Sequence, residues 1–128
     1  MLFHTYSSMQ AHRRAHDSAY MEIQHCRMDA AAPLAEIVAT DSLRHWQKDS
    51  LYVHFDELDT FFSAYGAIFG SGVYNNLQSE PIDPYGVNYF SPDRVREIVA
   101  RLQASDAPER DVLAAWLQDA RGVYVLGI

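Results

Sequence analysis

Residues 51–70, LYVHFDELDTFFSAYGAIFG, decide the fold of this chain. Leu51–Phe55 is a short run rich in β-forming residues, so it predicts a strand. Apolar and aromatic side chains then recur at helical spacing, which predicts an amphipathic helix over residues 57–69 with an aromatic face. Asp56 is placed to cap the start of that helix, and Gly70 is placed to end it.

The sequence after Gly70 continues the mixture of helices and strands. Residues 70–84 are rich in Gly, Asn, Asp and Pro and predict a loop. Gly86–Phe90 follows as a second candidate strand. Ser91 then starts a helix as its cap, with proline next to it at the first helical position. Another helix is expected from near Pro108, and Val123–Leu126 predicts a closing strand.

The N-terminal part has a weaker pattern. Leu2–Tyr6 is a possible strand, and Ala19–Cys26 fits either a strand or a helix by periodicity, with alternation favouring the strand. Pro33–Ala39 and Ser42–Lys48 predict short helices. Strands and helices without a regular alternation predict an α+β fold, with a small, mainly antiparallel sheet packed against several amphipathic helices. The length of 128 residues fits one domain, 1–128.

The formal charge of −7 lies in the centre of the chain. No Lys or Arg occurs from Asp49 to Asp93, a span that holds seven acids, while the flanking segments are each balanced. A concentrated negative field steers positively charged partners toward a surface and raises their association rate. The composition therefore favours binding of a basic partner.

Composition also limits the function classes. A pI near 5.2 argues against nucleic acid as the main partner, because phosphate contacts require clustered Lys and Arg. No signal peptide and no apolar run long enough to span a bilayer are apparent, so no membrane partner is expected. The single cysteine, Cys26, excludes an internal disulfide and is expected to be a buried or incidental thiol and not a nucleophile. Together these features predict a cytoplasmic location.

Two arrangements of histidines are of the types found in metal sites or in acid–base catalysis. His12 and His16 share one face of a helix, as two metal ligands would, but Arg13 and Arg14 lie beside them. A solvated basic helix face is the better account, and no bound metal or cofactor is expected.

The other arrangement is His54 close to Asp56 and Asp59, which could act as a general base in a small hydrolase or metabolite-binding enzyme. The simpler interpretation is a half-exposed strand histidine. No catalytic residue is predicted, and the enzyme remains an alternative.

The segment Tyr74–Tyr85 is the better candidate for an interface, because Tyr and Asn make adaptable contacts on exposed loops. An ordinary solvated loop explains it equally well. The start of the predicted helix adds further acids beside it. The expected partner-binding residues are Asp56, Glu57, Asp59, Tyr74, Asn76, Glu80, Asp83 and Tyr85.

Residues 51–102 resemble small bacterial immunity proteins, which accompany polymorphic toxins and contact-dependent growth inhibition systems. The resemblance rests on the run from Leu51 to Phe69, the turn Tyr74-Asn-Asn-Leu77, and the segment Tyr85–Pro92. It implies a protein that binds and neutralises one cognate toxin, commonly a basic nuclease domain, without catalysis of its own. The oligomeric state stays open.

Overall fold

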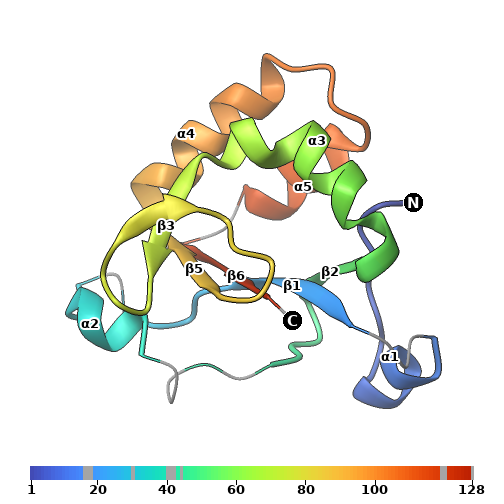
Figure 1. The fold of residues 1–128 in the computed structure, drawn as a ribbon, viewed down its shortest axis with the longest axis horizontal. Helices are drawn as coiled ribbons and strands as arrows, with labels where there is room; N and C mark the ends of the chain where they lie inside the picture. Colours follow the sequence, from blue (N-terminus) through green and yellow to red (C-terminus); the bar gives the residue numbers. More distant parts are fainter. Residues whose placement is uncertain (16–18, 30, 40–42, 44, 119–120, 128) are drawn as a thin grey trace.

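The computed structural model describes residues 1–15, 19–29, 31–39, 43, 45–118 and 121–127 (Figure 1). Within these ranges, six strands form one sheet in the order β2-β1-β6-β5-β3-β4, and every neighbouring pair is antiparallel. The α+β prediction, with an antiparallel sheet against helices, is confirmed. The strands are β1 (Tyr20–His25), β2 (Leu51–His54), β3 (Ser71–Tyr74), β4 (Ser79–Pro81), β5 (Val87–Phe90) and β6 (Val123–Leu126). The helices are α1 (Met9–Ala15), α2 (Leu34–Ile37), the 3-10 turn η2 (Phe55–Glu57), α3 (Leu58–Phe69), α4 (Pro92–Gln103) and α5 (Arg110–Leu117).

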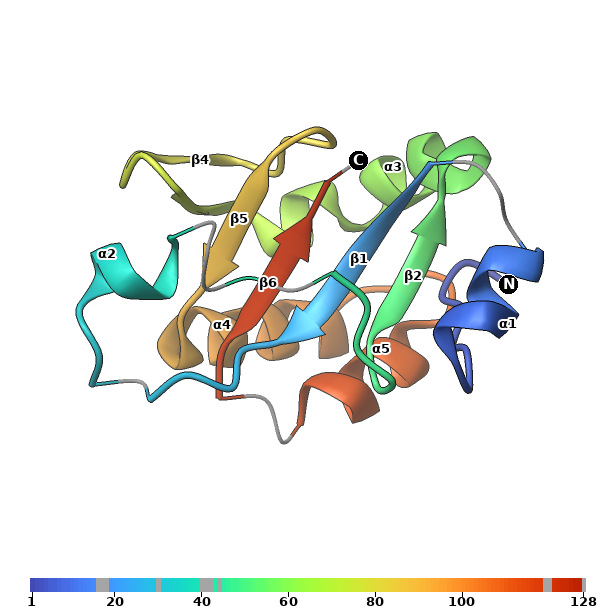
Figure 2. The same ribbon diagram turned by 90° about the horizontal axis from the view of Figure 1, so that it is seen from below.

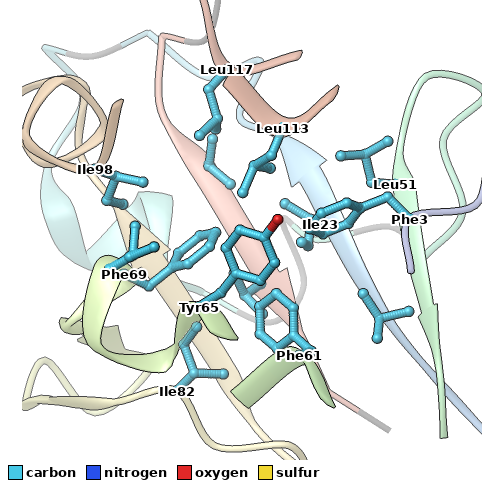
Figure 3. Packing of buried hydrophobic residues seen from close by; sticks show 14 of the residues in the cluster. Phe3, Ile23, Leu51, Phe61, Tyr65, Phe69, Ile82, Ile98, Leu113 and Leu117 are labelled. Carbon is cyan, nitrogen blue, oxygen red and sulfur yellow. The ribbon is translucent and has the colours of Figure 1, made fainter. Parts of the chain in front are cut away.

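Helices α3, α4 and α5 cover one face of the sheet (Figures 1 and 2). The main core lies between this helical layer and the strands, and Figure 3 shows its aromatic centre around Phe61, Tyr65 and Phe69 of α3. Phe3 packs edge-on against Tyr65, with 5.3 Å between ring centroids. Burial of such large side chains supplies most of the driving force for folding. The fold therefore depends on residues 51–70, which include α3.

The opposite face of the sheet is also covered. Tyr89 and Tyr124 form a second cluster there with Ile37 and Val38, at the end of the sheet where α2 lies. The Tyr124 hydroxyl donates a hydrogen bond of 2.6 Å to the Ile37 carbonyl oxygen. Because both faces are covered, the two sets of alternating side chains on the central strands are both buried.

Most predictions for the C-terminal two thirds are confirmed. The aromatic helix is α3, and it ends at Gly70 with a positive φ of 66°. The Ser91 side chain caps α4 by accepting a hydrogen bond from the Arg94 backbone N–H. β5 and β6 lie where the sequence placed them, and α5 begins at Arg110, two residues after Pro108.

Two predictions in the central segment are wrong. Asp56 does not cap α3: it lies inside the 3-10 turn η2, Glu57 takes the capping position, and neither side chain makes a capping hydrogen bond. Residues 70–84 are not one loop, because β3 and β4 form a hairpin there. Short strands with Gly, Ser and Pro carry little strand propensity, so tertiary pairing with β5 decides this segment.

Of the predictions for the N-terminal part, some are confirmed and others are only partly met. Ala19–Cys26 holds the strand β1, whose Met21 and Ile23 face the main core. Leu2–Tyr6 contributes only a bridge, in which the backbones of His4 and Tyr52 exchange two hydrogen bonds of 2.9 Å. The helix predicted at Pro33–Ala39 is the single turn α2. In the segment Ser42–Lys48, residues 42 and 44 lie outside the described residues, and residues 45–48 are not helical.

No described helix combines the length and the apolar character needed to cross a membrane.

Candidate functional site

The sheet topology places the predicted partner-binding residues along one edge, except Glu80, which pairs with Gly72 further along β3. Tyr20 is paired with His54, Glu22 and Val87 with Leu126, and Tyr74 with Asn88. The end of β2, the start of β1, the end of β6 and the start of β5 therefore lie at the same edge (Figure 2), and the end of β3 lies beside the start of β5. We call this edge, together with the adjoining outermost strand β4 that carries Glu80, the acidic edge. Its members by prediction are Asp56, Glu57, Asp59, Tyr74, Asn76, Glu80, Asp83 and Tyr85.

These residues form two groups rather than one patch. Asp56, Glu57 and Asp59 follow β2, whereas the other five belong to the β3–β4 hairpin and the loop before β5. Four strand spacings separate β2 from β3 in the sheet order, which is roughly 19 Å at about 4.8 Å per spacing. A partner that covers about 800 Å² of one surface, roughly 30 Å across, can touch both groups.

The acids of this edge differ from those of α4 in their ion pairing. Asp56, Asp59 and Glu80 are exposed, and across the described ranges neither they nor Asp83 pairs with a Lys or Arg. On α4, by contrast, each arginine has an acid of the same helix beside it. Arg94 and Arg101 pair with Glu97, and Arg96 pairs with Asp93. In the described part of the chain, no lysine or arginine therefore compensates the charge of the edge locally.

A shallow pocket of about 300 Å³ lies in the second group. Tyr74, Asp83 and Tyr85 line it, together with His45, Asn75, Gly86, Val87, Leu126 and Gly127. Tyr85 is 68% exposed, whereas the Tyr74 hydroxyl donates a hydrogen bond to the Pro81 carbonyl oxygen. Partial burial, aided by the charges of Asp83 and Glu80, raises the pKa of Tyr74. Tyr74 thus shapes the pocket, and Tyr85 is the side chain that a partner can reach.

Some predicted residues also have a local structural role. Asn76 Oδ1 accepts a hydrogen bond of 2.9 Å from the Gln78 backbone N–H and shapes the hairpin turn. Asp83 Oδ1 accepts one of 2.9 Å from the Tyr85 backbone N–H. These contacts explain part of the Asn and Asp content of the segment without any partner.

The buried side chain of Asn88 holds the loop in place. Its Oδ1 accepts a hydrogen bond of 3.0 Å from the Asp83 backbone N–H, and its Nδ2 donates one of 3.4 Å to the Glu80 carbonyl oxygen. The sequence predicted a strand here but no role for Asn88. A polar residue inside an otherwise apolar strand was the available signal, since a buried amide requires partners.

A buried carboxylate positions the segment that brings His45 to the pocket. Glu22 is fully buried and accepts hydrogen bonds from the backbone N–H groups of Trp46 (2.8 Å) and Gln47 (3.1 Å) and from the Ser50 hydroxyl (2.6 Å). Burial alone would raise its pKa, but the hydrogen bonds, including one with His45, hold the pKa of Glu22 below its ordinary value. The same contact raises the pKa of His45.

Glu57 of the first group also belongs to a second cluster, which it forms with His4, Tyr6 and His54. Glu57 Oε1 lies 2.8 Å from His4 Nε2 and 3.4 Å from His54 Nδ1. The Tyr6 hydroxyl lies 2.6 Å from His54 Nε2. No sequence pattern links His4 and Tyr6 to this cluster, because they are about fifty residues away from their partners along the chain.

This cluster corrects the account of His54. The side chain is buried, not half-exposed, because Tyr6 and the His4 ring cover it. Glu57 is the carboxylate beside it, whereas Asp56 and Asp59 face solvent. The pairing on which the hydrolase alternative rested is therefore replaced by His54 with Glu57.

Three further residues considered from the sequence are His12, His16 and Cys26. His12 is buried against the rings of Tyr6, Tyr20 and Tyr52, so the predicted solvated face is wrong for this residue. His16 lies outside the described residues. Cys26 is a buried free thiol, as expected.

No protein-family model, no curated protein and no solved structure matches this chain.

Proposed function

We propose that this protein is an inhibitor that binds a basic toxin domain in the cytoplasm and neutralises it stoichiometrically, as the resemblance to immunity proteins implies. The observation that carries the proposal is the two groups of acids on the acidic edge, to which no Lys or Arg of the described residues is paired. Unpaired acids of this kind attract a cationic surface, including one that normally binds nucleic acid.

The proposed mechanism has two stages. The charges of Asp56, Asp59 and Glu80 accelerate the encounter, and a neighbouring pocket then receives side chains of the partner. Tyr85 acts as the anchor, because it is exposed and aromatic and lies beside Asp83 in that pocket. A stable complex of this type buries about 1,600 Å² in total.

The test uses the C-terminal domain of the protein encoded immediately upstream as the partner, with binding kinetics measured from low to high salt. The double variant Asp56→Asn/Glu80→Gln should lower the association rate constant about three- to tenfold at low salt, with a smaller change at high salt. Both side chains are exposed, so the fold should be unaffected.

The matched control is Glu36→Gln/Asp106→Asn, which removes the same two charges at exposed positions on α2 and after α4. This variant should bind like the wild type. An equal effect of the two double variants would show that net charge matters and the acidic edge does not. No binding of the upstream domain by the wild type would overturn the proposal.

Tyr85→Ala tests the anchor separately. We expect a loss of about 1–3 kcal/mol in binding free energy, mainly as faster dissociation. Val112→Ala is the comparison, since Val112 is also an exposed apolar side chain but lies on α5.

A further inference from the structure

The cluster at the end of β2 combines three side chains of the types that bind transition metals. His4 Nε2, His54 Nδ1 and a Glu57 carboxylate oxygen all lie within 4.8 Å of one another. Imidazole nitrogen and carboxylate oxygen are ordinary zinc ligands, and three protein ligands leave a fourth position for water or a substrate atom. We propose that these three residues bind one divalent transition-metal ion, with zinc as the reference ion.

The spacing of the donor atoms fits a small ion. Bonds of about 2.0–2.1 Å at tetrahedral angles separate neighbouring ligand atoms by roughly 3.4 Å. His54 Nδ1 and Glu57 Oε1 are 3.4 Å apart, which matches this separation. The contact of 2.8 Å between His4 Nε2 and the same oxygen is a hydrogen bond that an ion would replace, with an opening of about half an ångström.

The backbone brings the ligands together before any ion binds. Residue 4 is tied to the β2 backbone by two hydrogen bonds with Tyr52, and His54 lies two residues further along the same strand. Glu57 follows in the turn η2. Ligands held on a paired strand and the turn after it lose little freedom on binding, which favours affinity.

The Tyr6 hydroxyl orients one ligand. It lies 2.6 Å from His54 Nε2, the ring nitrogen that does not face Glu57. With Nδ1 on the ion, Nε2 carries the proton and donates to the Tyr6 oxygen. Metal-binding histidines commonly donate their other N–H to such an acceptor, which selects the tautomer and strengthens the ligand.

Binding requires one side-chain movement. The His4 and His54 rings are stacked, with centroids 4.0 Å apart and planes 23° apart. A ring nitrogen bonds in the plane of its ring, so two nearly parallel rings cannot aim at one ion. The His4 side chain is 23% exposed and His54 only 4%, so His4 is the ring that turns out of the stack.

The proposed metal site does not use the histidine pair that the sequence pointed to. No metal was expected, because only His12 and His16 had metal-ligand spacing. The new site shares neither residue and joins an N-terminal segment to the end of β2. It also adds a role for Glu57 that does not depend on toxin binding.

The experiment is a calorimetric titration of the full metal-free chain with zinc chloride, with magnesium chloride as a second probe. The wild type should bind one zinc ion and no magnesium, because magnesium prefers oxygen ligands. His4→Ala and Glu57→Gln should each weaken zinc binding at least about tenfold, and Tyr6→Phe should weaken it less. Asp106→Asn, which removes an exposed carboxylate far along the chain from the cluster, should leave binding unchanged.

Asp56→Asn separates ligation from charge. It removes a neighbouring negative charge without removing a ligand, so its effect should be clearly smaller than that of Glu57→Gln. Nitrogen-15 chemical shifts of the ring nitrogens provide a direct readout, and zinc should move His4 Nε2 and His54 Nδ1 most. Wild-type-like zinc affinity in both His4→Ala and Glu57→Gln, or no zinc binding by the wild type, would overturn the proposal.

Folding of the variants has its own check. Circular dichroism compares their secondary structure with that of the wild type. Zinc should raise the thermal midpoint of the wild type clearly more than that of Glu57→Gln, since an ion stabilises a folded state in proportion to how tightly it binds. Equal zinc-induced shifts in both proteins would contradict the assignment.

Discussion

Asn88 accepts a hydrogen bond of 3.0 Å from the backbone N–H of Asp83, across the base of the loop that carries Tyr85. The amide of Asn88 is fully buried, and its other end donates to the Glu80 carbonyl oxygen. The buried side chain of Asn88 thus holds the backbone of both Glu80 and Asp83, the two acids of the second group, in position. The shape of the proposed binding surface depends on a residue that no partner can touch.

Replacement of Asn88 by Leu should therefore loosen the loop. The N–H of Asp83 and the carbonyl of Glu80 would lose their partner, which costs about 1–3 kcal/mol of unfolding free energy. Urea unfolding measures this change. Asn75→Leu, at an exposed position near the same pocket, should stay within about 0.5 kcal/mol of the wild type.

Glu22 should control the stability of the segment around His45 as a function of pH. Its folded-state pKa lies below its ordinary value of 4.5, so the ionised form is favoured by folding. The contribution is complete above the unfolded-state pKa and is lost as the pH falls through the lower folded-state pKa. Glu22→Gln removes this contribution.

The corresponding measurement is the unfolding free energy of wild type and Glu22→Gln from pH 7 to pH 3. The variant should be less stable by about 1–3 kcal/mol at pH 7, because the amide nitrogen replaces one of the two accepting oxygens and leaves the N–H of either Trp46 or Gln47 without an acceptor. The difference should shrink below pH 4.5. A constant difference across this range would contradict the assigned role of the carboxylate.

Gly127 should tolerate no side chain. A Cβ at this position would lie 2.5 Å from the Pro84 carbonyl oxygen and 2.6 Å from the Gly86 nitrogen. Gly127→Ala must therefore displace the loop before β5 or lose the hydrogen bond of 2.7 Å from its N–H to the Gly86 carbonyl oxygen. We expect a cost of about 1–3 kcal/mol in thermal or urea unfolding.

Gly66→Ala is the control for that variant. Gly66 lies within α3, and a methyl group added there would meet no neighbouring atom of the described residues within 4 Å. Alanine should stabilise the helix by about 0.5–1 kcal/mol, because glycine costs backbone entropy in a helix interior. Similar destabilisation by both alanines would refute the steric explanation for Gly127.

The aromatic centre of the core should dominate stability. Phe61 is fully buried beneath α3 and contacts the rings of Phe3 and Phe69 (Figure 3). Phe61→Ala should cost about 3–5 kcal/mol, whereas Phe62→Ala, next to it and only partly buried, should cost clearly less. Equal losses in urea unfolding would contradict the assigned packing.

The sequence predicted the elements whose signals are local. The aromatic periodicity of α3, the serine cap at Ser91 and the β-rich run of β6 each depend on neighbouring residues, and each is confirmed. The cap predicted at Asp56 failed because a 3-10 turn precedes the helix. The β3–β4 hairpin was missed because its residues form a strand only through pairing with β5.

Of the two candidate sites, one could be predicted from the sequence and the other could not. The absence of Lys and Arg from the centre of the chain is a property of the sequence, and it predicted an acidic surface before any fold was considered. The antiparallel order of the strands then decided that its two groups lie on one edge. The cluster of His4, Tyr6, His54 and Glu57 needed the tertiary structure altogether, because a backbone bridge joins segments 48 residues apart. Features that depend on neighbouring residues can be predicted from the sequence, whereas contacts between distant segments form only once the sheet has formed.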